Sequence, residues 1–307
     1  MEESLNATMC KCYDKALQGH PCVAKVEQVM YMNKAIQIAY NEFFEIKCKI
    51  ASEAGFDSIA INFHDMENRL DTTWKEAAGR ILKILHDYGL KCVQTHLPYY
   101  DMLISAEILQ DEMEAAIRES IRVSGEIGAP WCVYHPRSAV NWGFSSAKAL
   151  EINKSVISDY IECAEKSNTG IALENLPIFQ IIPAKPFYSS DYYDLCELSD
   201  YFQSEHVGIC WDTGHANMMH FDQAQAIKFL GDRIKCTHIH NNFTARDLHL
   251  PPDTGHIKWE KVMEAFMSIH YSGPLTLETH CVYNDEVLWK SFAQHNYECL
   301  RYLERLI

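Results

Sequence analysis

Short apolar runs alternate with amphipathic stretches along most of this chain. Seven of the runs have the length and the apolar, β-branched composition of buried strands: DSIAINF, KCVQTHL, WCVYH, GIALEN, HVGICWD, CTHIH and PLTLET. Helical patterns follow, as over Thr73–Tyr88, Ser105–Ile127, Ser145–Lys166 and Asp285–Leu306. Glycine ends several of these helices, in EAGFD, DYGLK and EIGAP. The repeated order of strand, helix and glycine predicts parallel βα units.

The spacing of the polar residues at the strand ends indicates the number of units. Intervals of 38 or 39 residues, one βα unit each, separate His96, His135, Glu174 and Asp212. A closed barrel needs one more strand, which we place within Cys22–Tyr40, ahead of a helix over Asn41–Gly55. Eight units in 307 residues match the (β/α)8 TIM barrel, whose active sites lie at the C-terminal strand ends. An open doubly wound sheet is the alternative, but the chain lacks its Gly-x-Gly-x-x-Gly turn.

The length and composition bound the domain organisation and the partners. We expect a single domain over residues 1–307, with residues 1–30 as an N-terminal extension. No apolar run approaches the roughly 18–20 residues of a membrane span, and the N-terminus lacks a signal-peptide pattern. The 12 scattered cysteines are typical of free thiols in a reducing compartment, and a net charge of -15 disfavours nucleic acid. We therefore expect a soluble, cytoplasmic protein without a membrane partner, and a homo-oligomer stays open.

Carboxylates and imidazoles close most of the predicted strands. Because strand ends converge in a barrel, we expect one cavity to contain His96, His135, Glu174, Asp212, His215, His238 or His240, and Glu278. Such a cluster is costly in a dry pocket unless a cation compensates its charge. These side chains are the ligand types of zinc, manganese, cobalt and magnesium. The sequence therefore predicts a divalent metal centre.

These motifs resemble the xylose isomerase-like barrels, which include sugar and sugar-phosphate isomerases and epimerases, inosose dehydratases and endonuclease IV. The resemblance extends from about Asn41 to the C-terminus and rests on ALENLP, WDTGHAN, THIHNN, LETH and DLHLPPDTGHIKW. In the last segment, Asp253 and Thr254 stand where many relatives have Gly-Glu. The resemblance implies the barrel fold, a metal centre, and action on a sugar or on a phosphodiester.

The resemblance implies two alternative ligand sets. The sugar epimerases hold one metal ion with residues that correspond to Glu174, Asp212, a histidine of HIH and Glu278. Endonuclease IV holds three zinc ions with nine residues, which match His96, His135, Glu174, Asp212, His215, His238, Asp247, His249 and Glu278. The endonuclease pattern selects His238 and the epimerase pattern selects His240, and both can face inward because residues two apart on a strand share a side. The expected cofactor is therefore one to three ions of manganese, zinc, cobalt or magnesium.

Two chemistries fit such a centre. A sugar or sugar-phosphate isomerase or epimerase would transfer a proton through a metal-stabilised enediolate, with Glu174 and Glu278 as proton carriers and His215 binding a hydroxyl. We expect the two carboxylates at the ends of the fourth and eighth strands, on opposite sides of the barrel. The alternative is an endonuclease IV-like phosphodiester hydrolase, an AP endonuclease. A metal-dependent lyase or a non-catalytic binding barrel is a third interpretation.

The loops after the predicted strands favour a small substrate over DNA. They contain few basic residues, among them Arg137 and Arg246, whereas a DNA enzyme needs several phosphate contacts. Aromatic residues that suit stacking on a small ring are Tyr99, Tyr100, Trp142, Phe144, Phe179, Phe187 and Tyr188. We therefore expect a carbohydrate substrate, with Arg137, Trp142 and Arg246 as substrate-binding residues.

Overall fold

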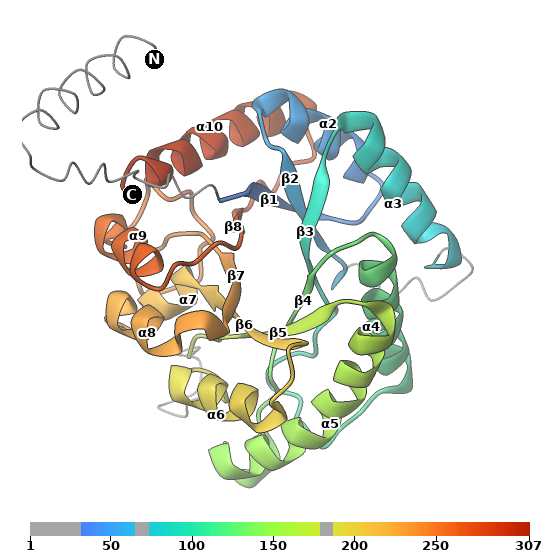
Figure 1. The fold of residues 1–307 in the computed structure, drawn as a ribbon, viewed down its shortest axis with the longest axis vertical. Coiled ribbons are helices and arrows are strands. Elements are labelled where there is room, and N and C mark those ends of the chain that lie inside the picture. Colours follow the sequence, from blue (N-terminus) through green and yellow to red (C-terminus); the bar gives the residue numbers. More distant parts are fainter. Residues whose placement is uncertain (1–31, 65–73, 179–186) are drawn as a thin grey trace, which may run out of the picture. The chain divides into compact units, whose positions relative to one another are not determined.

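The computed structural model describes residues 32–64, 74–178 and 187–307, so the expected N-terminal extension lies outside the described residues. The compact unit Met32–Ile307 contains eight parallel strands that form a barrel (Figure 1). The strands are β1 (Lys34–Ala39), β2 (Ser58–Asn62), β3 (Lys91–His96), β4 (Trp131–Tyr134), β5 (Gly170–Glu174), β6 (Val207–Asp212), β7 (Ile234–His238) and β8 (Leu275–Leu277). The prediction of a TIM barrel is confirmed.

The strands pair in the order β7-β6-β5-β4-β3-β2-β1-β8. Strand β1 pairs in parallel with β2 on one side and with β8 on the other, which brings the first and last units together. Between β7 and β8 the ladder is reduced to a single bridge, where Ile239 N donates to Thr276 O (2.7 Å) and Glu278 N donates to Ile239 O (3.1 Å). The barrel is therefore nearly closed.

Strand β1 confirms the additional strand that the sequence analysis expected. It lies at Lys34–Ala39, inside the segment in which an additional strand was expected. With β1 counted, Glu174 ends the fifth strand, so its assignment to the fourth strand is wrong. In the sheet order β6 and β7 separate β5 from β8, so Glu174 and Glu278 do not lie on opposite sides of the barrel.

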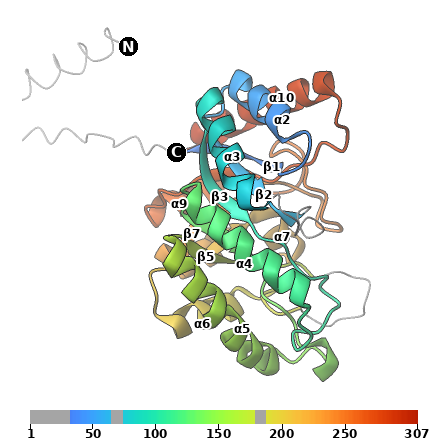
Figure 2. The same cartoon turned by 90° about the vertical axis from the view of Figure 1, so that its right-hand side faces the viewer.

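Helices surround the strands (Figure 1). They are α2 (Phe44–Ala54), α3 (Trp74–Tyr88), α4 (Asp111–Glu126), α5 (Ser146–Ser167), α6 (Tyr192–Phe202), α7 (Thr213–Met218), α8 (Gln223–Leu230), α9 (Trp259–Ser268) and α10 (Glu286–Glu304), with short 3-10 helices at Val140–Trp142 and Gly231–Arg233. Figure 2 shows α3, α4 and α5 in succession along one side of the barrel, as their mutual contacts require.

Helix α4 begins at Asp111, six residues later than the expected start at Ser105. The preceding segment is held by other parts of the chain, because the carbonyl oxygens of Ser105 and Ile108 accept hydrogen bonds from Arg137 Nη2 (3.0 and 2.6 Å). The backbone amide of Ala106 donates to Ser138 O (2.9 Å). Tertiary contacts therefore replace the first helical turn that the sequence pattern indicates.

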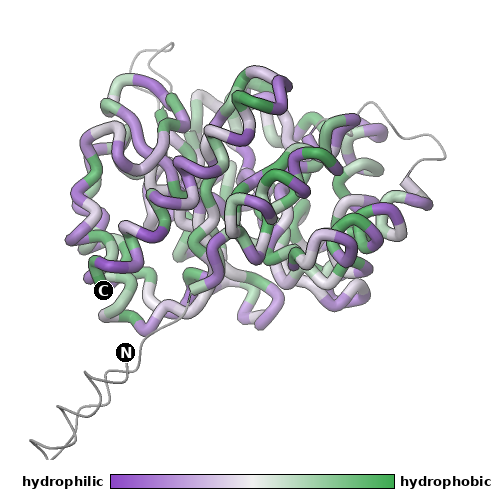
Figure 3. The backbone as a smooth tube through the Cα atoms, turned by 90° about the horizontal axis from the view of Figure 1, so that it is seen from above, coloured by the Kyte–Doolittle hydropathy of each residue, from purple (hydrophilic) through white to green (hydrophobic). Residues whose placement is uncertain are grey.

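The core lies between the strands and the inner faces of the helices. Hydrophilic and hydrophobic segments alternate along the outer helices, as expected for helices that bury one face (Figure 3). Among the buried strand residues, Cys92, Cys132, Cys210 and Cys236 are free thiols that pack as small apolar side chains. No helix among the described residues is both long and apolar enough to cross a membrane.

Candidate metal centre

A cavity of about 160 Å³ opens where the carboxyl ends of the strands converge. It is lined by Asn62, His96, Tyr99, Met102, His135, Glu174, Leu176, Pro177, His215, Asp247, His249, Glu278 and His280. The remaining candidate ligands, Asp212, His238 and His240, are fully buried. Their donor atoms, together with those of the lining residues, fall into overlapping groups, and within each group all donor atoms lie within 4.8 Å of one another. Three groups are described below, and a fourth, made of His96, His238 and Glu278, connects the first of them to the second.

The first group consists of Glu174, Asp212, His238 and Glu278. His238 Nδ1 lies 2.9 Å from Glu174 Oε1, 3.1 Å from Glu278 Oε2 and 3.7 Å from Asp212 Oδ2. All four side chains are buried. One protonated imidazole offsets only one of the carboxylates, so the group keeps a net negative charge that burial makes costly. This donor set fits a divalent cation.

The second group consists of His96, His135 and Glu174. His135 Nε2 lies 2.9 Å from Glu174 Oε2, and His96 Nε2 lies 3.4 Å from that oxygen and 3.1 Å from His135 Nε2. Nitrogen and oxygen ligands of a tetrahedral zinc ion, bound at about 2.0–2.2 Å, lie about 3.3 Å apart. The donor separations therefore fit a bound cation, and Glu174 belongs to both the first and the second group.

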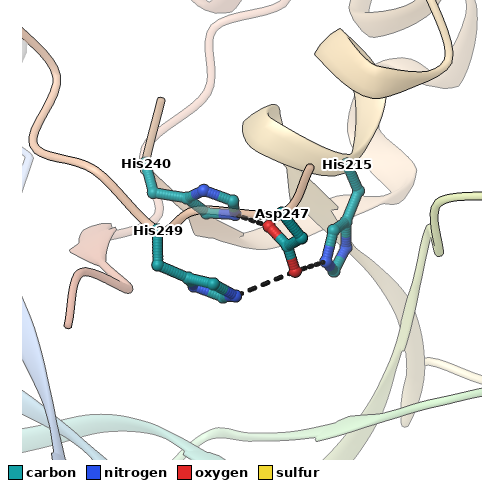
Figure 4. Close-up of side chains that lie close together, drawn as sticks. All are labelled: His215, His240, Asp247 and His249. Carbon is teal, nitrogen blue, oxygen red and sulfur yellow. Dashed lines mark hydrogen bonds and ion pairs between the residues drawn. The ribbon is translucent and has the colours of Figure 1, made fainter. Parts of the chain in front are cut away.

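The third group consists of His215, His240, Asp247 and His249 (Figure 4). Asp247 Oδ2 lies 3.1 Å from His215 Nε2 and 2.9 Å from His249 Nε2, and Oδ1 lies 3.9 Å from His240 Nε2. Figure 4 shows the carboxylate between the imidazole rings. His249 has a φ of 46°, a left-handed conformation that is uncommon for residues other than glycine. The third group therefore combines side chains of the metal-ligand type with an uncommon backbone conformation at His249.

Backbone carbonyl oxygens orient several of these imidazoles. The Nδ1 atoms of His96, His215 and His249 lie 2.9, 2.8 and 2.8 Å from the carbonyl oxygens of Leu97, Asn175 and Glu278. A carbonyl oxygen can only accept, so each Nδ1 carries a proton, and Nε2 is the ring atom left for a ligand bond. This arrangement is typical of histidines that bind a metal ion.

Short-range structure sets the position of Asp212. It ends β6 and caps α7, because its Oδ1 accepts the His215 backbone N–H (2.6 Å). Asn175 holds the Asp212 backbone with two hydrogen bonds, of 2.7 and 2.9 Å. Asp212 Oδ2 lies 3.0 Å from His240 Nε2, so this carboxylate connects the first group to the third. The WDTGH motif thus serves two donor groups at once.

Neighbouring charges shift the pKa values of two groups in this cluster in opposite directions. Burial lowers the pKa of His249, but its hydrogen bond to Asp247 and the charge of Glu278 outweigh burial and raise it to about 9. Burial raises the pKa of Glu174, yet the charges of His238 and His135 outweigh burial and hold it well below its ordinary value. Glu174 is therefore ionised, as a ligand of a cation must be.

The structure assigns His238 and His240 to different groups. Both side chains are fully buried, as expected for residues two apart along an extended segment. His238 contacts Glu174 and Glu278, whereas His240 contacts Asp212 and stacks on His249 with 4.2 Å between the ring centroids. The four-residue set of the epimerase pattern therefore forms around His238, and not around the His240 which that pattern selected.

The three expected substrate-binding residues do not line the cavity. Arg137 is buried, its Nη2 donates to the Ser105 and Ile108 carbonyls, and its guanidinium lies 3.8 Å from the Tyr100 ring centroid. Trp142 is 61% exposed, and Arg246 is exposed beside Asp247. Their roles toward a substrate stay predictions. Of the expected stacking aromatics, Tyr99 lines the cavity, and Phe179 lies outside the described residues.

Three cavity or support residues were missed from the sequence. Gln37 on β1 donates from Nε2 to Glu278 Oε1 (2.8 Å), and it sits on the strand that was hardest to place. Asn175, which accepts a hydrogen bond from the Asp212 backbone, follows Glu174 directly. Its position just after a strand end could have indicated a place near the cavity. His280 lines the cavity and stacks on His249 with 4.0 Å between the ring centroids. It follows Glu278 by two residues, a spacing that could have placed it on the same side.

Relatives of the chain are found by sequence. Protein y4fM of Sinorhizobium fredii is 37% identical over 78 residues, which span 25% of this chain and 25% of that relative. Protein MJ1311 of Methanocaldococcus jannaschii is 27% identical over 204 residues, 64% of this chain and 67% of the relative. Both relatives are described only as uncharacterized proteins, so they identify no activity.

Solved structures and a family model agree with the fold. A D-tagatose 3-epimerase-like protein is 21% identical with a TM-score of 0.66, covering 87% of this chain and 98% of the other. A D-psicose 3-epimerase is 14% identical with a TM-score of 0.69, covering 89% and 99%. The model of the family described as xylose isomerase-like TIM barrel matches residues 48–300. Because this match spans most of the chain, the protein belongs to the xylose isomerase-like TIM-barrel family.

Proposed function

We propose that this protein is a divalent-metal-dependent isomerase or epimerase of a sugar or sugar phosphate. The observation that carries the proposal is the first group, in which two glutamates from different strands, Glu174 and Glu278, contact the same imidazole of His238. Structures of similar fold include proteins described as D-tagatose 3-epimerase-like and D-psicose 3-epimerase. Their descriptions agree with a carbohydrate substrate for this chain.

Glu174, Asp212, His238 and Glu278 would hold the cation. When bound, it supplies Lewis-acid polarisation of neighbouring carbonyl and hydroxyl oxygens of the substrate, which acidifies the adjacent C–H group. The residues of the third and second groups would bind further ions or orient substrate hydroxyls. His215, whose Nε2 lies at the cavity beside Asp247, suits the second of these tasks.

The two glutamates would transfer the proton. Glu278 comes from the end of β8 and Glu174 from the end of β5, so they approach the cavity from separate strands. One carboxylate removes the proton next to the substrate carbonyl, and either glutamate returns it, which isomerises or inverts that carbon. Gln37 Nε2 donates to Glu278 Oε1 at 2.8 Å and thereby fixes the orientation of this carboxylate. Both side chains are buried, so bulk water has little access to the proton in transit.

Hydrogen exchange tests the proposal directly. The metal-loaded protein is incubated in heavy water with a panel of ketoses and ketose phosphates, and deuterium uptake beside the carbonyl is followed by NMR. We expect uptake with at least one substrate, and Glu278→Gln should slow it by about 10²–10⁴-fold, the usual contribution of a general acid or base. Glu126→Gln changes an exposed carboxylate on α4 and serves as the matched control. Absence of exchange across the panel contradicts the proposal.

A metal-dependent phosphodiester hydrolase is a second candidate, and the second and third groups favour it. Beyond the first group, a single-ion mechanism requires no further ligands, yet these groups add His96, His135, His215, His240, Asp247 and His249. The net charge of -15 argues against a long nucleic-acid substrate. Cleavage of an oligonucleotide with an abasic site, together with no ketose exchange, would replace the first proposal with this one.

A further inference from the structure

A separate cluster of metal-ligand side chains lies among residues that do not line the cavity. Asp253 belongs to the loop that precedes α9, and His295 and Cys299 are four residues apart on α10. Residues at this spacing share a helix face, so the imidazole and the thiol point to the same side. The donor atoms of all three side chains lie within 4.8 Å of one another.

The separations between the donor atoms match those around a tetrahedral zinc ion. Asp253 Oδ1 lies 3.2 Å from His295 Nε2 and 3.6 Å from Cys299 Sγ, and Sγ lies 3.8 Å from Nε2. Bond lengths of about 2.3 Å for sulfur and 2.0–2.1 Å for nitrogen and oxygen predict about 3.3, 3.5 and 3.6 Å for the same pairs. Each observed separation is close to its expected value.

The framework around the cluster holds Asp253 against α10. The carbonyl oxygen of the preceding residue, Pro252, accepts hydrogen bonds from Trp259 Nε1 (2.7 Å) and Asn241 Nδ2 (2.9 Å). The backbone N–H of Thr254 donates to Pro251 O (2.9 Å), which closes the turn. Cys299 is only 6% exposed, yet its Sγ faces the carboxylate of Asp253 and the imidazole of His295. A thiol, a carboxylate and an imidazole whose donor atoms converge are the ligand types of a zinc ion.

We propose that Asp253, His295 and Cys299 bind a divalent cation of the zinc type. The side chains of His295 and Asp253 are 52% and 51% exposed, so the fourth ligand position is open to solvent. Binding exchanges the thiol proton for the cation and releases that proton to water. The bound ion would tie α10 to the loop that also carries Asp247 and His249. This site involves none of the side chains of the three cavity groups.

Cobalt substitution tests the site without interference from the cavity. The full chain is produced in minimal medium with cobalt as the added divalent metal, and its absorption spectrum is recorded. The three cavity groups contain only histidine, aspartate and glutamate, so a thiolate-to-cobalt charge-transfer band in the near ultraviolet reports Cys299. Cys10→Ser and Cys12→Ser are made in the background protein, because this pair has the closest cysteine spacing in the sequence.

We expect the band in the background protein and its loss in Cys299→Ser, in His295→Gln and in Asp253→Ala. Cys196→Ser is the matched control, because Cys196 also lies on a helix 3.6 Å from an aspartate, Asp200, but that aspartate is paired with Arg233. This control should keep the full band. Absence of the band in the background protein, or its persistence in Cys299→Ser or Asp253→Ala, means that the three side chains are only hydrogen-bonded and overturns the proposal. If Cys299→Ser does not fold, Asp253→Ala decides, because it changes an exposed side chain.

Discussion

Gly214→Ala should destabilise the protein and disturb the third group. A Cβ atom at this position would lie 1.9 Å from Cε1 of His240, against about 3.5–4.0 Å for an ordinary carbon contact. The His240 ring cannot move away freely, because it stacks on His249 and its Nε2 lies 3.0 Å from Asp212 Oδ2. The added methyl group therefore displaces the fully buried imidazole of His240, or it displaces helix α7, which contains residue 214.

The size of the effect follows from overpacking a filled site. Such substitutions cost about 1–3 kcal/mol, and each kcal/mol lowers the Tm of a domain of this size by about 2–4 °C. We therefore expect a fall in Tm of roughly 2–12 °C. Because His240 contacts Asp212 and lies beside Asp247, we also expect a lower metal content.

Thermal denaturation followed by circular dichroism, at one fixed metal concentration, measures the change in Tm. Metal content is measured by elemental analysis of the same samples. Gly79→Ala is the matched control, since a Cβ atom there meets nothing within 4 Å and the residue lies in α3. Alanine in a helix is about 0.5–1 kcal/mol more stable than glycine, so this control should be stabilised. A Gly214→Ala protein as stable as the control, with full metal content, would refute the packing argument.

Three further predictions concern the cavity groups. Asp212→Ala should lower metal content and activity together, because Asp212 touches both His238 and His240; full occupancy by elemental analysis would exclude it as a ligand. His135→Ala should lose the ion of the second group and keep the first, and an unchanged metal count would leave the second group without a metal role. Affinity of the third group, measured by competition with a chelator, should fall as the pH drops below about 9, because the raised pKa of His249 makes protons compete with the cation. A metal affinity that does not change between about pH 6 and about pH 9 would contradict this competition.

The barrel, and the carboxylates and imidazoles at the carboxyl ends of its strands, could be predicted from the sequence. The alternation of apolar runs with helical patterns depends on local periodicity, which is visible without a structure. The polar residues at the strand ends follow from the same pattern, because parallel strands in a barrel end at one face. Even β1, which has few local signals, lies inside the segment in which the strand count required it.

Local periodicity predicts that side chains share a barrel face, but not the distances between their atoms. The donor groups combine residues from different strands, and His238 and His240 belong to different groups. The contact of Gln37 with Glu278 also connects two strands. These distances depend on the strand order, on the register between strands and on the rotamers that packing permits. Arg137 shows the same limit, because its guanidinium binds the carbonyls of a loop about 30 residues earlier in the chain. The sequence by itself determined which chemical groups reach the carboxyl end of the barrel, and only the tertiary structure decided which of them touch, because contact depends on barrel closure and side-chain packing between residues far apart in the chain.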